Sequence, residues 1–144
     1  MLRNQIRQLL RFIKYMRMVE VKQFEQIVRQ GEPGDAMFMI LQGEARVRIM
    51  IGGKESILAT LSIGDFFGEA SLFDHGPRSA DVVANEDSVL IRMGAADLEK
   101  MVQDAPDLAA PFLFAIGKTL TARIRADNKR FSEGVLSARM AGRI

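Results

Sequence analysis

The first stretch of the chain carries apolar and basic residues at helical spacing. Between residues 1 and 18, apolar side chains recur every three to four positions and basic side chains occupy most of the remaining circumference. The pattern predicts an amphipathic basic helix over residues 1–18, without any acidic residue. Its apolar positions are Leu2, Ile6, Leu9, Leu10, Ile13 and Met16, and its basic positions are Arg3, Arg7, Arg11, Lys14 and Arg17.

From Val19 onward the pattern changes to short apolar runs separated by turn residues. In the run from Ala45 to Ile51, apolar residues at odd-numbered positions alternate with Arg46 and Arg48, as in a strand with one buried face. Gly52-Gly53 then predicts a hairpin that returns the chain into the next run. The predicted strands are residues 19–21, 27–28, 37–41, 45–51, 55–61, 81–84 and 88–93.

About eight strands at this spacing are typical of a jelly roll or barrel. We therefore predict a mainly β fold, a double-stranded β-helix or jelly-roll barrel over residues 19–93, with a helix before it and a long helix after it. Phe73 and the nine methionines are expected to fill its core. The glycines expected to serve tight turns with positive φ are Gly31, Gly34, Gly43 and Gly64.

Two helices are predicted after the barrel, within residues 94–131. Residues 94–103 fit a short helix, and Ala105-Pro106-Asp107 ends it and begins a second one. The apolar stripe of the second helix continues to Phe131 for about six turns, more than one small barrel can cover, so we expect its second half to form a dimer seam. Gly134 is predicted to end this helix.

The remaining tail, residues 132–144, is too short for a helix-turn-helix DNA-binding unit, which needs two helices and a turn. We therefore expect no nucleic-acid binding by this chain. A basic helix at residues 1–18 would suit a membrane surface, an acidic partner or a neighbouring segment of a longer parent protein. We favour the alternative in which its apolar stripe packs on the domain's own barrel or on a symmetry mate.

Composition narrows the classes of function. With 144 residues and 48% hydrophobic content, the chain has the size and apolar content of one domain. It has no cysteine, no signal-peptide pattern and no apolar run long enough to span a membrane, so a cytoplasmic location is expected. A net charge of +2 is too small to predict nucleic acid as the ligand of the whole fold. A single histidine disfavours a metal site and catalysis, so we assign no catalytic or metal-binding residue.

The most informative stretch runs from Phe67 to Val83. Gly68 permits close approach of the backbone, Glu69 and Ser71 lie in a predicted short helical turn, and Gly76-Pro77 turns the chain to present Arg78. The N–H groups of such a turn and a guanidinium can bind a phosphate, while a carboxylate beside them suits a sugar hydroxyl. The alternative is a Glu69–Arg78 ion pair that only braces the loop. We favour the ligand because an exposed pair contributes only ~0–1 kcal/mol to stability.

This stretch resembles the phosphate-binding cassette of cyclic nucleotide-binding domains. The matching residues are Phe67-Gly68-Glu69-Ala70-Ser71-Leu72 and, after four residues, Pro77-Arg78-Ser79-Ala80. Gly31-Glu32-Pro33-Gly34-Asp35, Ile40-Leu41-Gln42-Gly43-Glu44 and Gly64-Asp65 precede them in the family's order, and the resemblance covers roughly residues 19–131. One departure is Phe24-Glu25-Gln26, where the family often has a Gly-Glu turn between its first strands.

The resemblance implies a role for each cassette residue. Backbone N–H groups from Gly68 onward, at Ala70 and Ser71, would bind phosphate, Glu69 would bind the ribose 2′-hydroxyl, and Arg78 would pair with the cyclic phosphate. Ser79 and Ala80 complete the expected binding set through hydroxyl or backbone groups. Asn128 of the final helix lies where activator-type members approach the base.

We therefore expect a sensor that binds cyclic AMP in preference to cyclic GMP and signals by moving its final helix, with no further cofactor. Ser79 permits either base, since members that prefer cyclic GMP often have threonine there. The expected partners are the nucleotide, a second copy through the final helix, and an unknown output partner or a missing domain of a parent protein. Alternatives are the same fold without a ligand, as a dimerisation module, or a cupin-type metalloenzyme.

Overall fold

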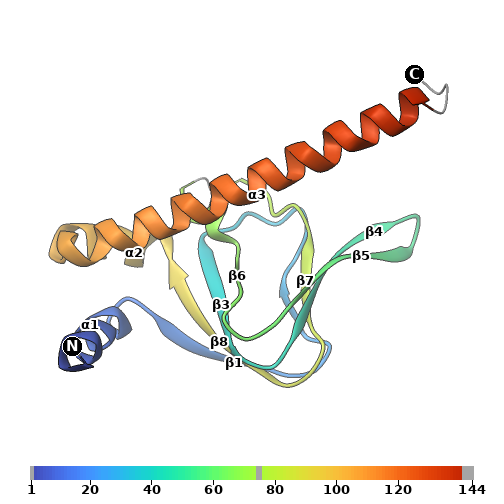
Figure 1. Cartoon of the computed structure of the whole chain (residues 1–144). Helices are drawn as coiled ribbons and strands as arrows, with labels where there is room; N and C mark the ends of the chain where they lie inside the picture. Colours follow the sequence, from blue (N-terminus) through green and yellow to red (C-terminus); the bar gives the residue numbers. More distant parts are fainter. Residues whose placement is uncertain (1, 74–75, 141–144) are drawn as a thin grey trace. The chain divides into compact units, whose positions relative to one another are not determined.

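The alternating strands and glycine turns build two antiparallel sheets in the computed structural model of the protein, which describes residues 2–73 and 76–140. The first sheet has the order β1-β8-β3-β6 and the second β2-β7-β4-β5 (Figure 1). The strands of the first sheet are β1 (Arg17–Val21), β3 (Ala36–Gln42), β6 (Phe66–Phe67) and β8 (Ser88–Gly94). Those of the second are β2 (Gln26–Val28), β4 (Ala45–Ile51), β5 (Lys54–Leu61) and β7 (Asp81–Ala84).

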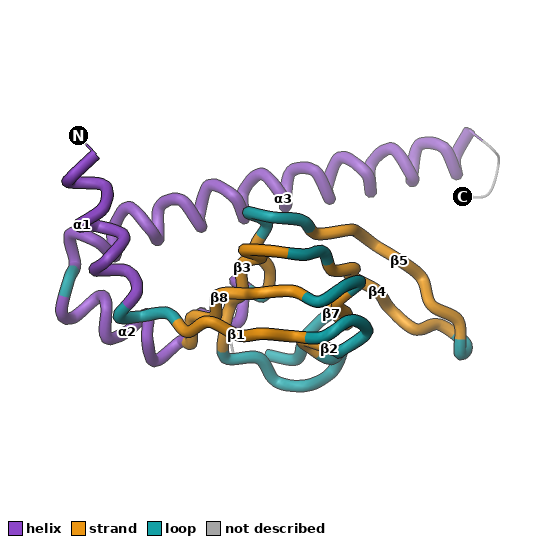
Figure 2. Tube along the Cα trace, turned by 90° about the horizontal axis from the view of Figure 1, so that it is seen from below, coloured by secondary structure: helices purple, strands orange, loops and turns teal. Residues whose placement is uncertain are grey.

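These eight strands, counted over the described residues, form the predicted jelly roll with a helix before it and a long helix after it. The core lies between the two sheets, and residues from both are fully buried there, among them Ile40 and Leu90 of the first sheet and Ala45 and Ala84 of the second. Burial of apolar side chains between the sheets stabilises the fold by about 25 cal/mol per Å² of apolar surface taken from water. Burial differs between strands, since β7 is buried along its whole length and β5 is exposed at all positions but the last. Figure 2 shows the β4–β5 hairpin extending past the other strands.

The alternation predicted for β4 breaks down halfway along the strand. Ala45 is buried, but Ile51 is 62% exposed. The pairing of β4 with β5 shifts between Val47 and Arg48, where Leu58 of β5 is left without a partner. Beyond Arg48, β4 has no pairing with β7, so the outer half of the hairpin extends past the second sheet and its apolar residues are exposed.

The N-terminal helix is shorter than predicted. The helix α1 covers Leu2–Ile13, and residues 17 and 18 belong to β1, which pairs with β8 from Arg17↔Arg92 onward. Pairing with β8 therefore overrides the helical pattern there. No residue of Leu2–Ile13 is buried, so packing of its apolar stripe on the domain's own barrel, one of the two packings that we favoured, is wrong, while packing on a symmetry mate stays a prediction. Phe73 is also 57% exposed and does not fill the core.

Phe24 takes the place of a turn glycine between β1 and β2. It has φ of 69°, a left-handed conformation that L side chains rarely adopt. Two hydrogen bonds to β7 hold it there, from Phe24 N to Ala84 O at 2.7 Å and from Ala84 N to Glu25 O at 3.0 Å. The two strands that it joins lie in different sheets, so the turn is a connection between sheets and not a hairpin.

The chain divides into two units, Met1–Pro106 and Asp107–Ile144. The first ends with α2 (Ala95–Asp104), as predicted, whose first turn is held by a 2.9 Å hydrogen bond from Gly94 N to Asp97 Oδ2. The second is formed by α3, which spans Pro106–Met140 and begins at the predicted proline. Over the described residues, no helix is both long enough and apolar enough to cross a membrane.

The helix α3 does not end at Gly134 as predicted. Gly134 lies inside it without the positive φ of a helix-ending glycine. Residues 132–140 of the predicted tail therefore continue the helix, and residues 141–144 lie outside the described residues. One glycine costs a helix only about 0.5–1 kcal/mol relative to alanine, which the flanking helix-forming residues overcome.

Candidate anion-binding site

The first wall of the site is built where β6 ends. Phe67 pairs with Phe38 of β3, and their rings stack with centroids 5.3 Å apart. Gly68 follows with φ of 77° and starts the 3₁₀ turn η1 (Glu69–Leu72), in which Ser71 N donates to Gly68 O at 3.0 Å. Within this turn Glu69 is buried and Ala70 is exposed. The anchored strand thus fixes where the turn begins.

The second wall is a pair of loops that run antiparallel. Gly31 N donates to Arg78 O at 2.8 Å, and Arg78 N donates to Glu32 O at 2.8 Å. Pro33 and Pro77 form a β-bridge beside them. Residues 74 and 75, between the two halves of the cassette, lie outside the described residues. The main chain of Arg78 is therefore fixed by the loop that follows β2.

The Arg78 side chain joins the two walls. Its Nη2 donates to the carbonyl oxygen of Ala36, the first residue of β3, at 3.1 Å. Its Nη1 is buried and has no hydrogen-bond partner among the described residues. A buried donor without a partner costs about 1–3 kcal/mol, so such atoms call for an explanation. An anion next to Nη1 would supply the missing acceptor.

Two glycines make room for this guanidinium. A Cβ on Gly34 would overlap Ser71 Oγ and Arg78 Nε, and one on Gly68 would overlap Arg78 Nη1 and lie 2.9 Å from Ala36 O. Gly34 has no positive φ, so its predicted role in a tight turn is wrong, whereas Gly31, Gly43 and Gly64 do have positive φ as predicted. What Gly34 supplies is space for Arg78.

The electrostatic surroundings of Arg78 favour a bound anion. Burial lowers the pKa of its guanidinium, nearby Asp35 opposes that change, and Arg92 lowers the pKa further. Asp35 and Arg92 also form an ion pair of 3.3 Å between Asp35 Oδ1 and Arg92 Nη2. A negative ligand would offset both the desolvation of Arg78 and its repulsion by Arg92.

The sequence prediction missed several supports of the site. It named neither Gly34 as the partner of Arg78 nor Ala36 as its acceptor, because both contacts join segments far apart in the sequence. It also missed Asp81, whose Oδ1 accepts from Gln30 N at 2.7 Å and whose Oδ2 accepts from Arg48 Nε at 3.2 Å. Asp81 thus steadies the loop that holds Arg78.

The structure brings seven of the eight predicted binding residues into the first unit. The first wall contains Gly68, Glu69, Ala70 and Ser71. The turn at Gly76-Pro77 is followed by Arg78, Ser79 and Ala80. Ser79 is exposed and Ala80 is buried. The eighth, Asn128, is an exposed residue of α3 in the second unit, and its role in reading the base stays a prediction.

The assembled groups can bind an anion and, through the carboxylate of Glu69, a hydroxyl donor. Over the described residues, no group of three histidine, cysteine or acidic residues is placed to hold a metal ion.

Comparisons with known proteins match most of the first unit, the part of the chain that contains this site. The family model of the cyclic nucleotide-binding domain matches residues 18–105. The CRP-like cAMP-activated global transcriptional regulator of Mycobacterium tuberculosis is 26% identical over 121 residues, which are 83% of this chain and 52% of that protein. The cyclic AMP receptor protein of Thermus thermophilus is 39% identical over 84 residues, which are 58% of this chain and 39% of that protein.

A solved structure of similar fold is the Thermus thermophilus catabolite activator protein. It has a TM-score of 0.76 and 31% identity, over 88% of this chain and 58% of that one. The chain thus spans about half or less of the length of the curated relatives named above.

Proposed function

This chain belongs to the cyclic nucleotide-binding domain family, and we propose that it is a sensor module that binds cyclic AMP in preference to cyclic GMP. The observation that carries the proposal is the buried Nη1 of Arg78, a cationic donor without an acceptor among the described residues. The cyclic phosphate supplies that acceptor. It also supplies the negative charge that offsets the desolvation of the guanidinium.

The remaining residues of the cassette contact different parts of the nucleotide. Backbone N–H groups from Gly68 to Ser71 bind the phosphate together with Arg78, and Ala70 is exposed in this turn. Glu69 accepts a hydrogen bond from the 2′-hydroxyl of the ribose. Ser79 and Ala80 complete the phosphate site through hydroxyl or backbone groups.

The base is read by Asn128. A side-chain amide can both donate to a ring nitrogen and accept from the amino group of adenine, which guanine does not offer in the same arrangement. Ser79 admits either base, so selectivity comes from α3. A wrong base leaves a buried polar group unpaired, which costs ~1–3 kcal/mol and corresponds to about ten-fold or more in affinity.

The output of the module is a movement or ordering of α3 when the nucleotide binds, with a second copy of the chain paired along the second half of that helix. No bond is broken in this process. The response passes to an output partner or to another domain of a longer protein, since the named relatives are about twice as long as the matched region or longer.

Two alternatives remain testable. The same fold without a nucleotide would act as a dimerisation module, but the unpaired donor of Arg78 and the buried Glu69 favour a ligand. A cupin-type metalloenzyme would need several metal ligands directed into the barrel, and metal analysis of the purified protein tests this class.

Calorimetric titration with cyclic AMP, cyclic GMP and cyclic di-GMP tests the proposed function. We expect cyclic AMP to bind at least about ten-fold more tightly than cyclic GMP. In Asn128→Ala this preference should disappear, while the neighbouring control Lys129→Ala should keep it. Binding of none of the three nucleotides would contradict the sensor function, and a preference untouched in Asn128→Ala would place selectivity in the barrel.

A further inference from the structure

The helix α1 presents an apolar face that nothing in its own unit covers. Five large apolar side chains of α1 are between 47 and 69% exposed: Leu2, Ile6, Leu9, Leu10 and Ile13. At 100° per residue these five fall within an arc of about 100° around the helix axis. The exposed residues therefore form one continuous stripe, which we call the α1 stripe.

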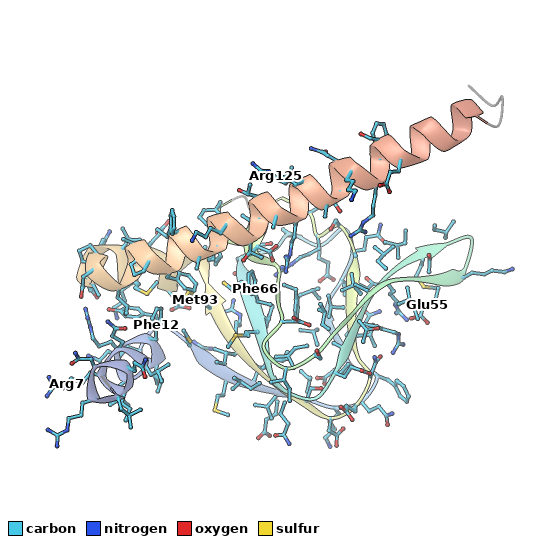
Figure 3. All side chains as sticks on the ribbon, in the orientation of Figure 1. Arg7, Phe12, Glu55, Phe66, Met93 and Arg125 are labelled. Atoms are coloured by element: carbon cyan, nitrogen blue, oxygen red, sulfur yellow. The ribbon has the colours of Figure 1, made fainter. Side chains whose placement is uncertain are left out.

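Cationic side chains lie directly beside the α1 stripe. Arg3 and Arg7 fall within the next ~60° of the helix circumference. The helix contains no acidic residue that would neutralise them. Figure 3 shows Arg7 on the outer side of α1, away from the strands.

A short linker with a buried tyrosine connects the helix to the barrel. Tyr15 is buried, and the helix ends in a turn with hydrogen bonds from Tyr15 N to Phe12 O at 2.9 Å and from Met16 N to Ile13 O at 3.3 Å. The chain then enters β1, whose pairing with β8 begins at Arg17. Figure 3 shows Phe12 on the side of α1 nearer to α2. The linker after α1 is thus anchored at Tyr15, while the α1 stripe stays exposed.

We propose that α1 is an interfacial helix that lies on an anionic lipid bilayer, with the α1 stripe among the acyl chains and Arg3 and Arg7 at the headgroup phosphates. A strongly amphipathic helix of low average hydropathy with a basic flank is the type that binds such surfaces. With 12 residues it is about 18 Å long, too short to cross the ~30 Å hydrocarbon core, so it lies in the plane of the surface.

The charge pattern favours lipid over a second copy of the chain. In an antiparallel symmetric pair the same face meets itself and the basic flanks of the two α1 helices lie on the same side of the pair, without an acidic residue of α1 between them. Lipid phosphates supply the opposite charge along the whole flank. The proposal is independent of nucleotide binding, because the α1 stripe shares no residue with the cassette.

Vesicle flotation of the full chain tests the proposal. We expect it to float with vesicles of phosphatidylcholine and phosphatidylserine but not with phosphatidylcholine alone, and to be released by high salt. Leu9→Gln with Ile13→Gln should abolish flotation. Arg3→Gln with Arg7→Gln should weaken it by about five-fold or more for each charge removed.

The matched controls are Ile57→Gln, an isoleucine of similar exposure on β5, and Lys54→Gln at the tip of the β4–β5 hairpin. Both should float like the unchanged protein, and all variants should keep its circular-dichroism spectrum, which shows that they fold. Equal flotation with neutral vesicles, or unchanged flotation of the Leu9 and Ile13 variant, would overturn the proposal. The proposal would also be overturned if the unchanged protein failed to float. A dimer in sedimentation that the Leu9 and Ile13 variant dissociates would then identify a second copy of the chain as the partner of the α1 stripe.

Discussion

At the residue scale, Arg78 combines a main chain fixed by hydrogen bonds with a side chain that lacks one hydrogen-bond acceptor. Two backbone hydrogen bonds hold its position, and Gly34 and Gly68 leave space around its guanidinium, yet Nη1 has no acceptor among the described residues. Groups that are held ready in this way bind a ligand without first having to be ordered. Three predictions follow from this arrangement and from its neighbour Glu69.

Arg78→Ala should abolish tight binding of cyclic AMP, with a loss of roughly 2–5 kcal/mol, because the phosphate would lie in a partly dry site without its cation. Thermal stability without ligand should barely change, since the substitution removes the bond to Ala36 O but also the unpaired donor. Calorimetry and thermal melts measure the two quantities. Lys54→Ala, at the hairpin tip, is the control, and undiminished affinity of Arg78→Ala would refute the phosphate role.

Glu69→Gln should weaken binding of cyclic AMP more than binding of its 2′-deoxy analogue. Only the ligand with a 2′-hydroxyl makes the charge-assisted hydrogen bond to the carboxylate, which contributes roughly 1.5–3 kcal/mol. The affinities of the two ligands should therefore converge in the variant, as measured by competition binding. Equal losses for both ligands would mean that Glu69 only supports the turn.

Gly34→Ala should lower the affinity for cyclic AMP by at least about ten-fold, equivalent to 1.4 kcal/mol, because the new methyl group overlaps Ser71 Oγ and Arg78 Nε and displaces the guanidinium. Titration calorimetry gives the affinity. Gly134→Ala is a matched control, since nothing lies within 4 Å of a Cβ built there. Normal affinity in Gly34→Ala would show that Arg78 can bind phosphate from another position.

At the element scale, the connection between β1 and β2 depends on a strained residue. Phe24 is held at φ of 69° by its bonds to Ala84 and is 66% exposed, so its ring adds little packing. Phe24→Gly should be more stable than Phe24→Ala by about 1 kcal/mol, because both lose the ring but only glycine adopts this conformation without a clash. Urea unfolding measures the difference. Equal stability would mean that the turn relaxes when the ring is removed.

At the scale of the whole molecule, we predict a homodimer paired along the second half of α3. Ile124 is 59% exposed, and a charge there would have to be buried in the pairing seam. Ile124→Glu should convert the dimer to a monomer in sedimentation equilibrium. Ile57→Glu, at an isoleucine that is 60% exposed on β5, should leave the dimer intact. A wild-type monomer, or a dimer insensitive to Ile124→Glu, would refute the seam.

The sequence by itself determined the order and type of the elements. Apolar residues recur with a period of two in strands and of about 3.6 in helices. The local pattern therefore predicts strands in residues 19–93 and helices in residues 94–131. It also located the cassette, because Gly68, Glu69 and Arg78 stand at a spacing that few other folds require. The family match over residues 18–105 confirms the resemblance to cyclic nucleotide-binding domains.

The tertiary structure alone decided where elements stop and which groups meet. Pairing of β1 with β8 placed residues 17 and 18 in a strand instead of the predicted helix, and the hydrogen bond to Ala84 O held Phe24 in a conformation that its side chain disfavours. The space at Gly34 matters only because Arg78, far along the chain, occupies it. Local pattern carries no information about such contacts, since their energy arises between residues that the fold, and not the sequence spacing, brings together.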